Sequence, residues 1–166
     1  RLFAGVTAGA LDSMLAHYTA FRKKRRDDAY TPGGRSGARP NRATIVYAGL
    51  VRQAFPGLPV VVGGIEASLR RATHYDFWSD SFRRSILLDS KADWLVCGMA
   101  ERALLDLARA MEAGGPVAPS TLRGVAWAES KPCPPPGDFA DAETLPSHED
   151  IAADPRRLMA PTLAFE

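Results

Sequence analysis

The sequence contains little cysteine, no long apolar run and almost no net charge, and each shortage argues against a class of protein. Two cysteines, Cys97 and Cys133, are too few and too isolated for a disulfide framework or a zinc site, so we expect a reducing, cytoplasmic setting. No apolar run approaches the roughly 20 residues of a transmembrane helix, so we expect no membrane partner. A formal net charge of +2 gives no strong attraction to nucleic acid, which we do not expect as a partner.

The sequence also lacks the short motifs by which several enzyme classes are recognised. Neither the phosphate-binding pattern Gly-x-x-x-x-Gly-Lys-Ser/Thr nor the dinucleotide-binding pattern Gly-x-Gly-x-x-Gly occurs. No serine lies in a Gly-x-Ser-x-Gly turn. A P-loop hydrolase, a dinucleotide-dependent oxidoreductase and a serine hydrolase therefore have no support in the sequence.

What is present is ordinary for a soluble domain: 166 residues, of which 46% are hydrophobic and 24% charged, enough for one core. The chain starts at Arg1 rather than at Met and enters an apolar stretch at once. We therefore expect a piece of a longer protein.

The stretch Pro-Val-Val-Val-Gly-Gly-Ile-Glu-Ala-Ser, residues 59–68, predicts a buried strand, a tight turn and the start of a helix. Turns of this kind lie at the carboxyl ends of parallel strands, where α/β proteins bind ligands. The pair Gly63 and Gly64 has two interpretations: a turn that needs positive φ and close packing, or a backbone that approaches a ligand. The spacing leaves both open.

Similar units precede and follow this stretch. Apolar runs bounded by turn residues predict strands over 2–8 and 91–98, and helical periodicity predicts helices over 42–55 and 99–112. Strands and helices that alternate with short connections are typical of a parallel sheet. The fold class is therefore α/β, with a Rossmann-like or flavodoxin-like parallel sheet flanked by helices.

Further elements follow from weaker signals. We expect a helix after a cap at Asp12 or Ser13, another helix over 82–89 and a short edge strand over 122–128. In the first of these helices we expect Met14, Leu15, Tyr18 and Phe21 to face the core. In the helix over 42–55 we expect the same of Ile45, Val46, Leu50, Val51 and Ala54. Prolines at 132 and 134–136 break all periodicity, so we divide the chain into an α/β domain, 1–130, and an irregular, extended, Pro-rich arm, 131–166, that leads toward another domain.

The candidate pocket edge lies where two parallel strands end. Gly63 and Gly64 end one strand and Gly98 ends the next, so the three belong to the same edge of the sheet. Glu66 and Ser68 are the polar side chains best placed to point into a site there. Glu101 is a second carboxylate near the start of the following helix.

Two other groups of residues have open interpretations. His74 and Asp76 could form an acid–base pair or bind a metal, but the aromatic residues around them favour a packed cap. The basic run Arg22–Arg26 could face an anion such as RNA phosphate or an acidic partner, but a charge run of this kind is usually a solvated surface. Arg35, Arg39 and Arg42 belong to a loop with the same two interpretations.

Several blocks of sequence, in order, resemble the amino-terminal region of the YgiQ-type radical SAM proteins. The blocks are residues 27–34 (Asp-Asp-Ala-Tyr-Thr-Pro-Gly-Gly), 39–43 (Arg-Pro-Asn-Arg-Ala), 60–71, 74–80, 83–93 and 97–103. The likeness runs from Arg1 to about Arg157. It implies an α/β domain similar to the cobalamin-binding domains that precede many radical SAM barrels.

The resemblance also implies cofactors, but not in this chain. In such proteins a Cys-x-x-x-Cys-x-x-Cys motif of the downstream barrel holds a [4Fe-4S] cluster that cleaves S-adenosylmethionine, and this chain has no such motif. It therefore implies no catalytic residue and no metal ligand here. The cobalamin signature Asp-x-His-x-x-Gly is absent as well, which argues against cobalamin.

These observations lead to two hypotheses. In the first, the chain is a non-catalytic accessory domain that positions or shields a downstream radical SAM barrel of unknown substrate. In the second, it is a stand-alone module that binds a corrinoid or a nucleotide at the edge formed by Gly63, Gly64 and Gly98.

Overall fold

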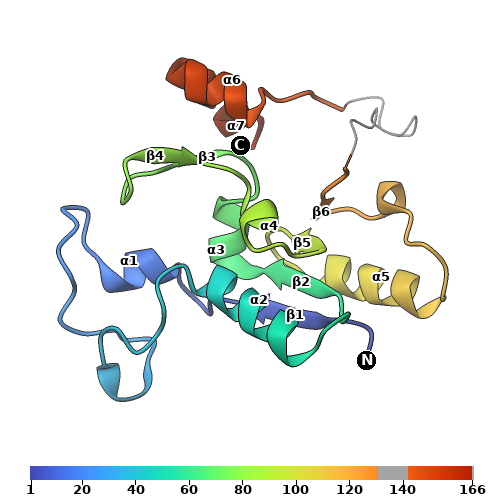
Figure 1. Cartoon of the computed structure of the whole chain (residues 1–166), viewed down its shortest axis with the longest axis horizontal. Helices are drawn as coiled ribbons and strands as arrows, with labels where there is room; N and C mark the ends of the chain where they lie inside the picture. The colour runs from blue at the N-terminus through green and yellow to red at the C-terminus, as the bar shows by residue number, and fades with distance from the viewer. Residues whose placement is uncertain (131–141, 166) are drawn as a thin grey trace.

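The computed structural model describes residues 1–130 and 142–165, and its centre is a four-stranded sheet (Figure 1). The sheet contains β1 (Ala4–Thr7), β2 (Val60–Gly63), β5 (Trp94–Val96) and β6 (Val125–Trp127), in the order β1-β2-β5-β6. The first three strands are parallel, and β6 is antiparallel at the edge. The α/β class and its parallel sheet are confirmed.

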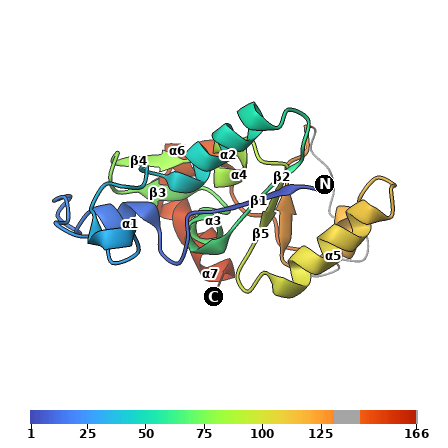
Figure 2. The same cartoon turned by 90° about the horizontal axis from the view of Figure 1, so that it is seen from below.

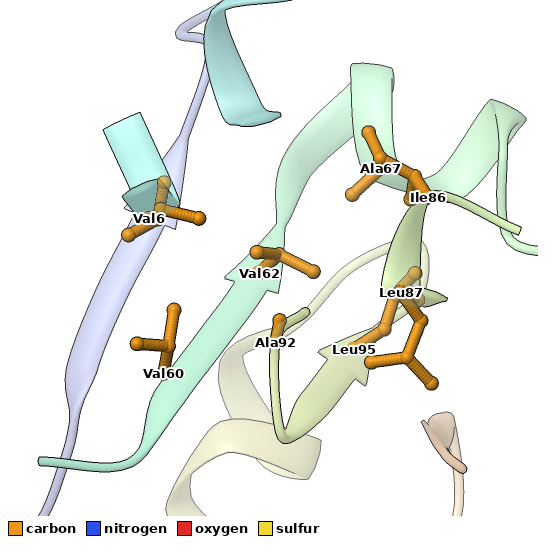
Figure 3. Packing of buried hydrophobic residues seen from close by; sticks show 9 residues of the cluster. Val6, Val60, Val62, Ala67, Ile86, Leu87, Ala92 and Leu95 are labelled. Atoms are coloured by element: carbon orange, nitrogen blue, oxygen red, sulfur yellow. The ribbon is translucent and has the colours of Figure 1, made fainter. Parts of the chain in front are cut away.

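Helices cover both faces of the sheet, as Figure 2 shows. The helices α2 (Ala43–Ala54) and α4 (Ile86–Asp89) lie on one face, and α5 (Glu101–Glu112) lies on the other. Side chains alternate accordingly: Val60 and Val62 belong to the core cluster on the α2 side (Figure 3), whereas Val61 packs with the α5 side. This alternation is what a strand buried on both faces requires.

Helix α2 has the predicted bounds, but its buried face is rotated from the predicted one. Val46 and Leu50 are exposed, and Thr44 and Ala48 are fully buried. Ile45 and Val51 of the predicted face pack partly buried against the core. The first turn is held by the backbone N–H of Thr44, which donates a hydrogen bond of 2.9 Å to a buried carboxylate on another segment.

Helix α1 (Ser13–His17) is shorter than predicted. The carbonyl of His17, which a longer helix would offer to residue 21, instead accepts a 2.7 Å hydrogen bond from the backbone N–H of Arg25. The chain turns back between them, with a positive φ at Arg22, and Phe21 is 86% exposed. The prediction that Phe21 belongs to the buried face of this helix is therefore wrong. So is that prediction for Leu15, which is exposed.

The predicted helix over 82–89 is only half correct. Residues Ser81–Arg83 form β4, which pairs antiparallel with β3 (His74–Asp76), and only α4 is helical. The boundary lies at Ser85, whose hydroxyl accepts a hydrogen bond of 3.2 Å from the Leu87 backbone N–H and so caps α4. The β3–β4 hairpin projects from the sheet on the side where the parallel strands end (Figure 1).

The carboxyl-terminal part is helical where an extended arm was expected. It contains α6 (His148–Ala153), the 3₁₀ turn η3 (Pro155–Leu158) and α7 (Met159–Ala164). Ser147 and Asp150 form a capping box at the start of α6, so local signals do favour a helix here. These helices lie beside the hairpin (Figure 1), where Arg84 pairs with Glu149 at 3.1 Å. The predicted break at Pro132–Pro136 lies outside the described residues.

Candidate functional site

The turn between β2 and α3 (Gly64–Leu69) has room only for glycine. Gly64 has φ +80°, and a Cβ atom there would lie 2.4 Å from Oγ1 of Thr7, at the end of β1. The same Thr7 oxygen accepts a 3.2 Å hydrogen bond from the Gly9 backbone N–H. Close packing of two strand ends therefore accounts for Gly64, the first of the two interpretations that the sequence left open.

Glu66 lies inside the protein and holds two helix starts in place. It is 1% exposed. One carboxylate oxygen accepts hydrogen bonds from the backbone N–H and the hydroxyl of Ser13, at 2.8 and 2.6 Å, and the other accepts from the Thr44 backbone N–H at 2.9 Å. Ser13 Oγ in turn accepts from the Ala43 N–H at 3.0 Å. The carboxylate thus binds the first residues of α1 and α2, where helix dipoles favour negative charge.

Ser68 and Gly98 lie together, as expected of two residues at the same sheet edge. The Gly98 backbone N–H donates a 3.0 Å hydrogen bond to Ser68 Oγ, which connects α3 with the loop after β5. Gly63, the last residue of β2, lies close to the end of β5, because a Cβ atom added there would lie 3.4 Å from the Val96 carbonyl oxygen. The five predicted pocket-edge residues therefore belong to one region. Three of them, Glu66, Ser68 and Gly98, form hydrogen bonds within the protein.

Two ion pairs with buried carboxylates lie at this edge, and sequence reasoning missed both. Arg70 pairs with Asp12, the residue that caps α1, and Arg42 pairs with Asp76 of β3. Asp76 also accepts a 2.8 Å hydrogen bond from the Ser79 hydroxyl. Burial raises the pKa of Asp76, but the hydrogen bonds from Arg42 and Ser79 outweigh burial and hold its pKa below the usual value.

His74 and Asp76 share a strand but not a hydrogen bond among the described residues. The His74 Nδ1 atom lies 3.1 Å from the Ala72 carbonyl oxygen. Burial lowers the pKa of His74, which favours the neutral imidazole. The structural interpretation, a packed cap, fits these contacts better than a paired acid and base.

A third ion pair fixes the loop that follows the basic run. Arg39 donates to one oxygen of Asp28 at 2.9 and 3.1 Å and to the Ala8 carbonyl at 2.9 Å. Burial raises the pKa of Asp28, but hydrogen bonds from the Tyr30 N–H and from Arg39 outweigh it and lower the pKa overall. The run Arg22–Arg26 itself is exposed, and none of the ion pairs within the described residues includes it.

Two cavities adjoin the pocket edge, on either side of Leu69, Tyr75 and His74. A cavity of about 180 Å³ is lined by Asp12, Met14, Leu15, Leu69, Arg70, His74, Tyr75, Asp76 and Phe77. A larger one, about 470 Å³, reaches α7 and includes Arg71, whose guanidinium lies 3.7 Å from the centre of the Phe165 ring. The five predicted residues line neither cavity, although Leu69 directly follows Ser68.

The residues present do not fit an iron–sulfur cluster. Such a cluster needs several thiolate ligands close together, and the sequence has two cysteines, 97 and 133. Burial raises the pKa of the Cys97 thiol, which disfavours the thiolate. Within residues 1–130 and 142–165, no group of His, Cys, Asp and Glu has the arrangement of a metal site. No helix in the same ranges is long and apolar enough to cross a membrane.

Comparison with known proteins gives a consistent result. The family model described as "Radical SAM N-terminal" matches residues 1–166. A UPF0313 protein from Geobacter sulfurreducens is 55% identical over 158 residues, which are 95% of this chain and 26% of that protein. A UPF0313 protein from Thermotoga neapolitana is 52% identical over 159 residues, which are 95% of this chain and 27% of that protein. Another from Vibrio vulnificus is 56% identical over 127 residues, which are 76% of this chain and 16% of that protein.

The chain thus spans about a quarter of the length of the first two relatives, 26% and 27%. No solved structure matches it.

Proposed function

The chain belongs to the radical SAM N-terminal family, and from this premise we propose that it is the accessory amino-terminal domain of a radical SAM enzyme. In this proposal a following barrel holds the [4Fe-4S] cluster and S-adenosylmethionine, and that cluster supplies the radical chemistry. The α/β domain, 1–130, and the segment 131–166 position or shield the barrel. A reducing, cytoplasmic location is part of the proposal, because an iron–sulfur cluster with thiolate ligands is stable there.

One observation supports a non-catalytic role above all: the polar groups of the sheet edge are engaged with one another. Glu66 accepts three hydrogen bonds, Ser68 accepts one from Gly98, and Asp12 is paired with Arg70. A general acid or base must reach the proton that it transfers, and a buried carboxylate held by two backbone N–H groups and a hydroxyl does not. The polar groups of this edge therefore serve to hold loops and helix starts together rather than to transfer protons.

The test uses the complete protein that carries this chain, reconstituted with iron and sulfide without oxygen. We expect a [4Fe-4S] absorption and cleavage of S-adenosylmethionine to 5′-deoxyadenosine. Ser68→Ala is expected to retain cleavage within about twofold of wild type, because the hydroxyl supports a loop rather than the reaction. Absence of the cluster and of cleavage in the wild-type protein would reject the proposal, and loss of cleavage in a folded, cluster-loaded Ser68→Ala variant would reject the non-catalytic role.

A second function, binding of a nucleotide or corrinoid, is favoured by the 470 Å³ cavity with the Arg71 guanidinium at its wall. In this alternative Gly63, Gly64, Glu66, Ser68 and Gly98 shape the neighbouring edge. Thermal unfolding of the chain with adenosine nucleotides and with cobalamins tests it. A rise in Tm that Arg71→Gln abolishes would support this function, and unchanged Tm with every compound would reject it.

A further inference from the structure

Large apolar side chains gather, exposed, around the edge where the parallel strands end. They come from five segments that are far apart in the sequence. The members are Leu15, Ile65, Leu69, Tyr75, Met99 and Phe165, and we refer to them as the carboxyl-edge apolar surface. Met99 is 87% exposed and Leu69 is 60% exposed, which is unusual for side chains that lose free energy in contact with water.

The described contacts make these residues neighbours. Leu15, Leu69 and Tyr75 line the smaller cavity, and Leu69, Tyr75 and Phe165 line the larger one. Ile65 lies one helical turn before Leu69 on the same face of α3. Met99 follows Gly98, which is hydrogen-bonded to Ser68, the neighbour of Leu69. The six therefore lie around the same sheet edge, where Leu69 and Tyr75 line both cavities.

The charged groups beneath this surface have partners within the domain, and the Arg71 guanidinium at the larger cavity lies 3.7 Å from the centre of the Phe165 ring and donates to the Ser68 carbonyl at 2.6 Å. Arg70 is paired with Asp12, and Arg42 with Asp76. Covering an unpaired charge is costly, whereas a pair that is already formed and hydrogen-bonded adds less to the cost of excluding water. An apolar surface whose charged groups have partners within the domain is suited to contact with another folded protein surface, since interface cores are depleted of free charge.

We infer that the carboxyl-edge apolar surface is where the remaining part of the same polypeptide, its radical SAM domain, docks. The lengths of the relatives indicate how large this remaining part is. The segment that matches this chain is 26% or 27% of their length, so about three quarters of each relative lies outside the matched segment. Helix α7 lines the larger cavity through Pro161 and Thr162 and ends just before Phe165, so the segment that follows the α/β sheet already lies at this surface. The inference rests on the proposed function, since it takes the partner from it.

Photo-crosslinking in the complete protein tests the location. p-Benzoylphenylalanine replaces Ile65 or Leu69, and in control variants it replaces Val46 or Leu50, which are exposed on α2. We expect crosslinks from 65 and 69 to peptides of the radical SAM domain of the same chain, about tenfold more than from 46 and 50. Crosslinks between two copies of the chain, or yields equal to those of the controls, would overturn the inference.

Substitution by a charge gives a second readout. Leu69→Glu is expected to lower S-adenosylmethionine cleavage about tenfold in protein that keeps its cluster, while Leu50→Glu changes it less than twofold, because only the former places an unpaired charge in the interface. Equal activity of the two variants would overturn the inference. A wild-type protein without cluster or cleavage would instead refute the proposed function, so the two failures are distinguishable.

Discussion

The sheet with its covering helices and the region beyond its carboxyl edge are stabilised by different interactions. Between β2 and α5 the contacts are apolar, with Val61, Val96 and Leu107 almost fully buried. Beyond the edge, buried carboxylates connect the loops: Glu66 binds the starts of α1 and α2, and Asp12 and Asp76 pair with arginines. The first region depends on shape and area, and the second on charge and hydrogen-bond geometry. The two should therefore respond differently to mutation and pH.

The largest expected effect is in the polar region. Glu66→Ala leaves the Ser13 and Thr44 backbone N–H groups buried without their acceptor and should lower the free energy of unfolding by about 3–5 kcal/mol. Urea unfolding measures it. Glu101→Ala, which removes an exposed carboxylate at the start of α5, is the control, with an expected change below about 0.5 kcal/mol. Equal effects of the two substitutions would contradict the structural role of Glu66.

The apolar region should respond nearly as strongly, but without pH dependence. Leu107→Ala removes a side chain with no exposed surface and should cost about 2–4 kcal/mol. Urea unfolding at pH 7 and pH 4.5 should give the same loss, because Leu107 packs in an apolar cluster with Val61, Val96 and Leu122. Leu105→Ala, on the exposed side of the same helix, should cost less than about 1 kcal/mol. A loss at Leu107 that changes with pH would break the distinction between the regions.

A smaller effect is expected where the two regions meet, at Gly64. Gly57 and Gly64 have nearly the same φ, +81° and +80°, but only Gly64 has a close neighbour, Thr7 Oγ1. Gly57→Ala should cost about 1 kcal/mol from backbone strain, and Gly64→Ala about 2–3 kcal/mol from strain plus the steric contact.

A double-mutant cycle separates the two contributions to the cost at Gly64. In a Thr7→Ala background the excess cost of Gly64→Ala over Gly57→Ala should shrink, since the hydroxyl that the new methyl group would meet is gone. Costs that are identical at the two glycines in the wild-type background would show that the strand ends are not in close contact.

The smallest effect is the pH dependence of the polar region. The folded-state pKa values of Asp28 and Asp76 are lowered, so their contribution to stability is present above the unfolded-state pKa of about 3.9 and is lost as pH falls through the folded values. The pKa of His74 is also lowered, so the unfolded chain takes up that proton first, and stability should begin to fall below about pH 6.5.

Asn substitution tests this dependence directly. The free energy of unfolding of Asp76→Asn, measured by urea titration from pH 7 to pH 3, should decline less steeply below pH 5 than that of wild type. His74→Gln should remove only the part of the decline that begins below about pH 6.5. Parallel curves for wild type and Asp76→Asn would show that the ion pair with Arg42 contributes nothing to the acid sensitivity.

The two regions also differed in how far the sequence predicted them. The valines at 60–62 predicted a buried strand, and all three are buried. The ion pairs leave no periodic signal: Arg70 and Asp12 are 58 residues apart, and each arginine could pair with any of 19 acidic residues. Backbone contacts leave no such signal either: the hydrogen bond from Arg25 to the His17 carbonyl ends α1 early, and pairing with β3 makes residues 81–83 a strand where a helix was predicted.

The predicted pocket edge shows the same limit. The position of Gly63, Gly64 and Gly98 at one edge could be inferred because parallel strands end together. The direction of the Glu66 side chain could not, because it depends on the approach of α1 and α2, which lie 53 and 22 residues away in the sequence. The sequence therefore predicted that these residues share one edge of the sheet but not that the Glu66 carboxylate points inward.

The separations spanned by Glu66 also bear on the kinetics of folding. The pairing of β1 with β2 spans 56 residues, from Ala4 to Val60, and brings Ser13 to within a short loop of Glu66, so the Glu66 contacts across 53 and 22 residues are expected to form after that pairing. Interactions that form after the rate-limiting step slow unfolding and leave the rate of folding almost unchanged. Glu66 is then a determinant of how long the folded edge persists, rather than of how quickly the chain reaches it.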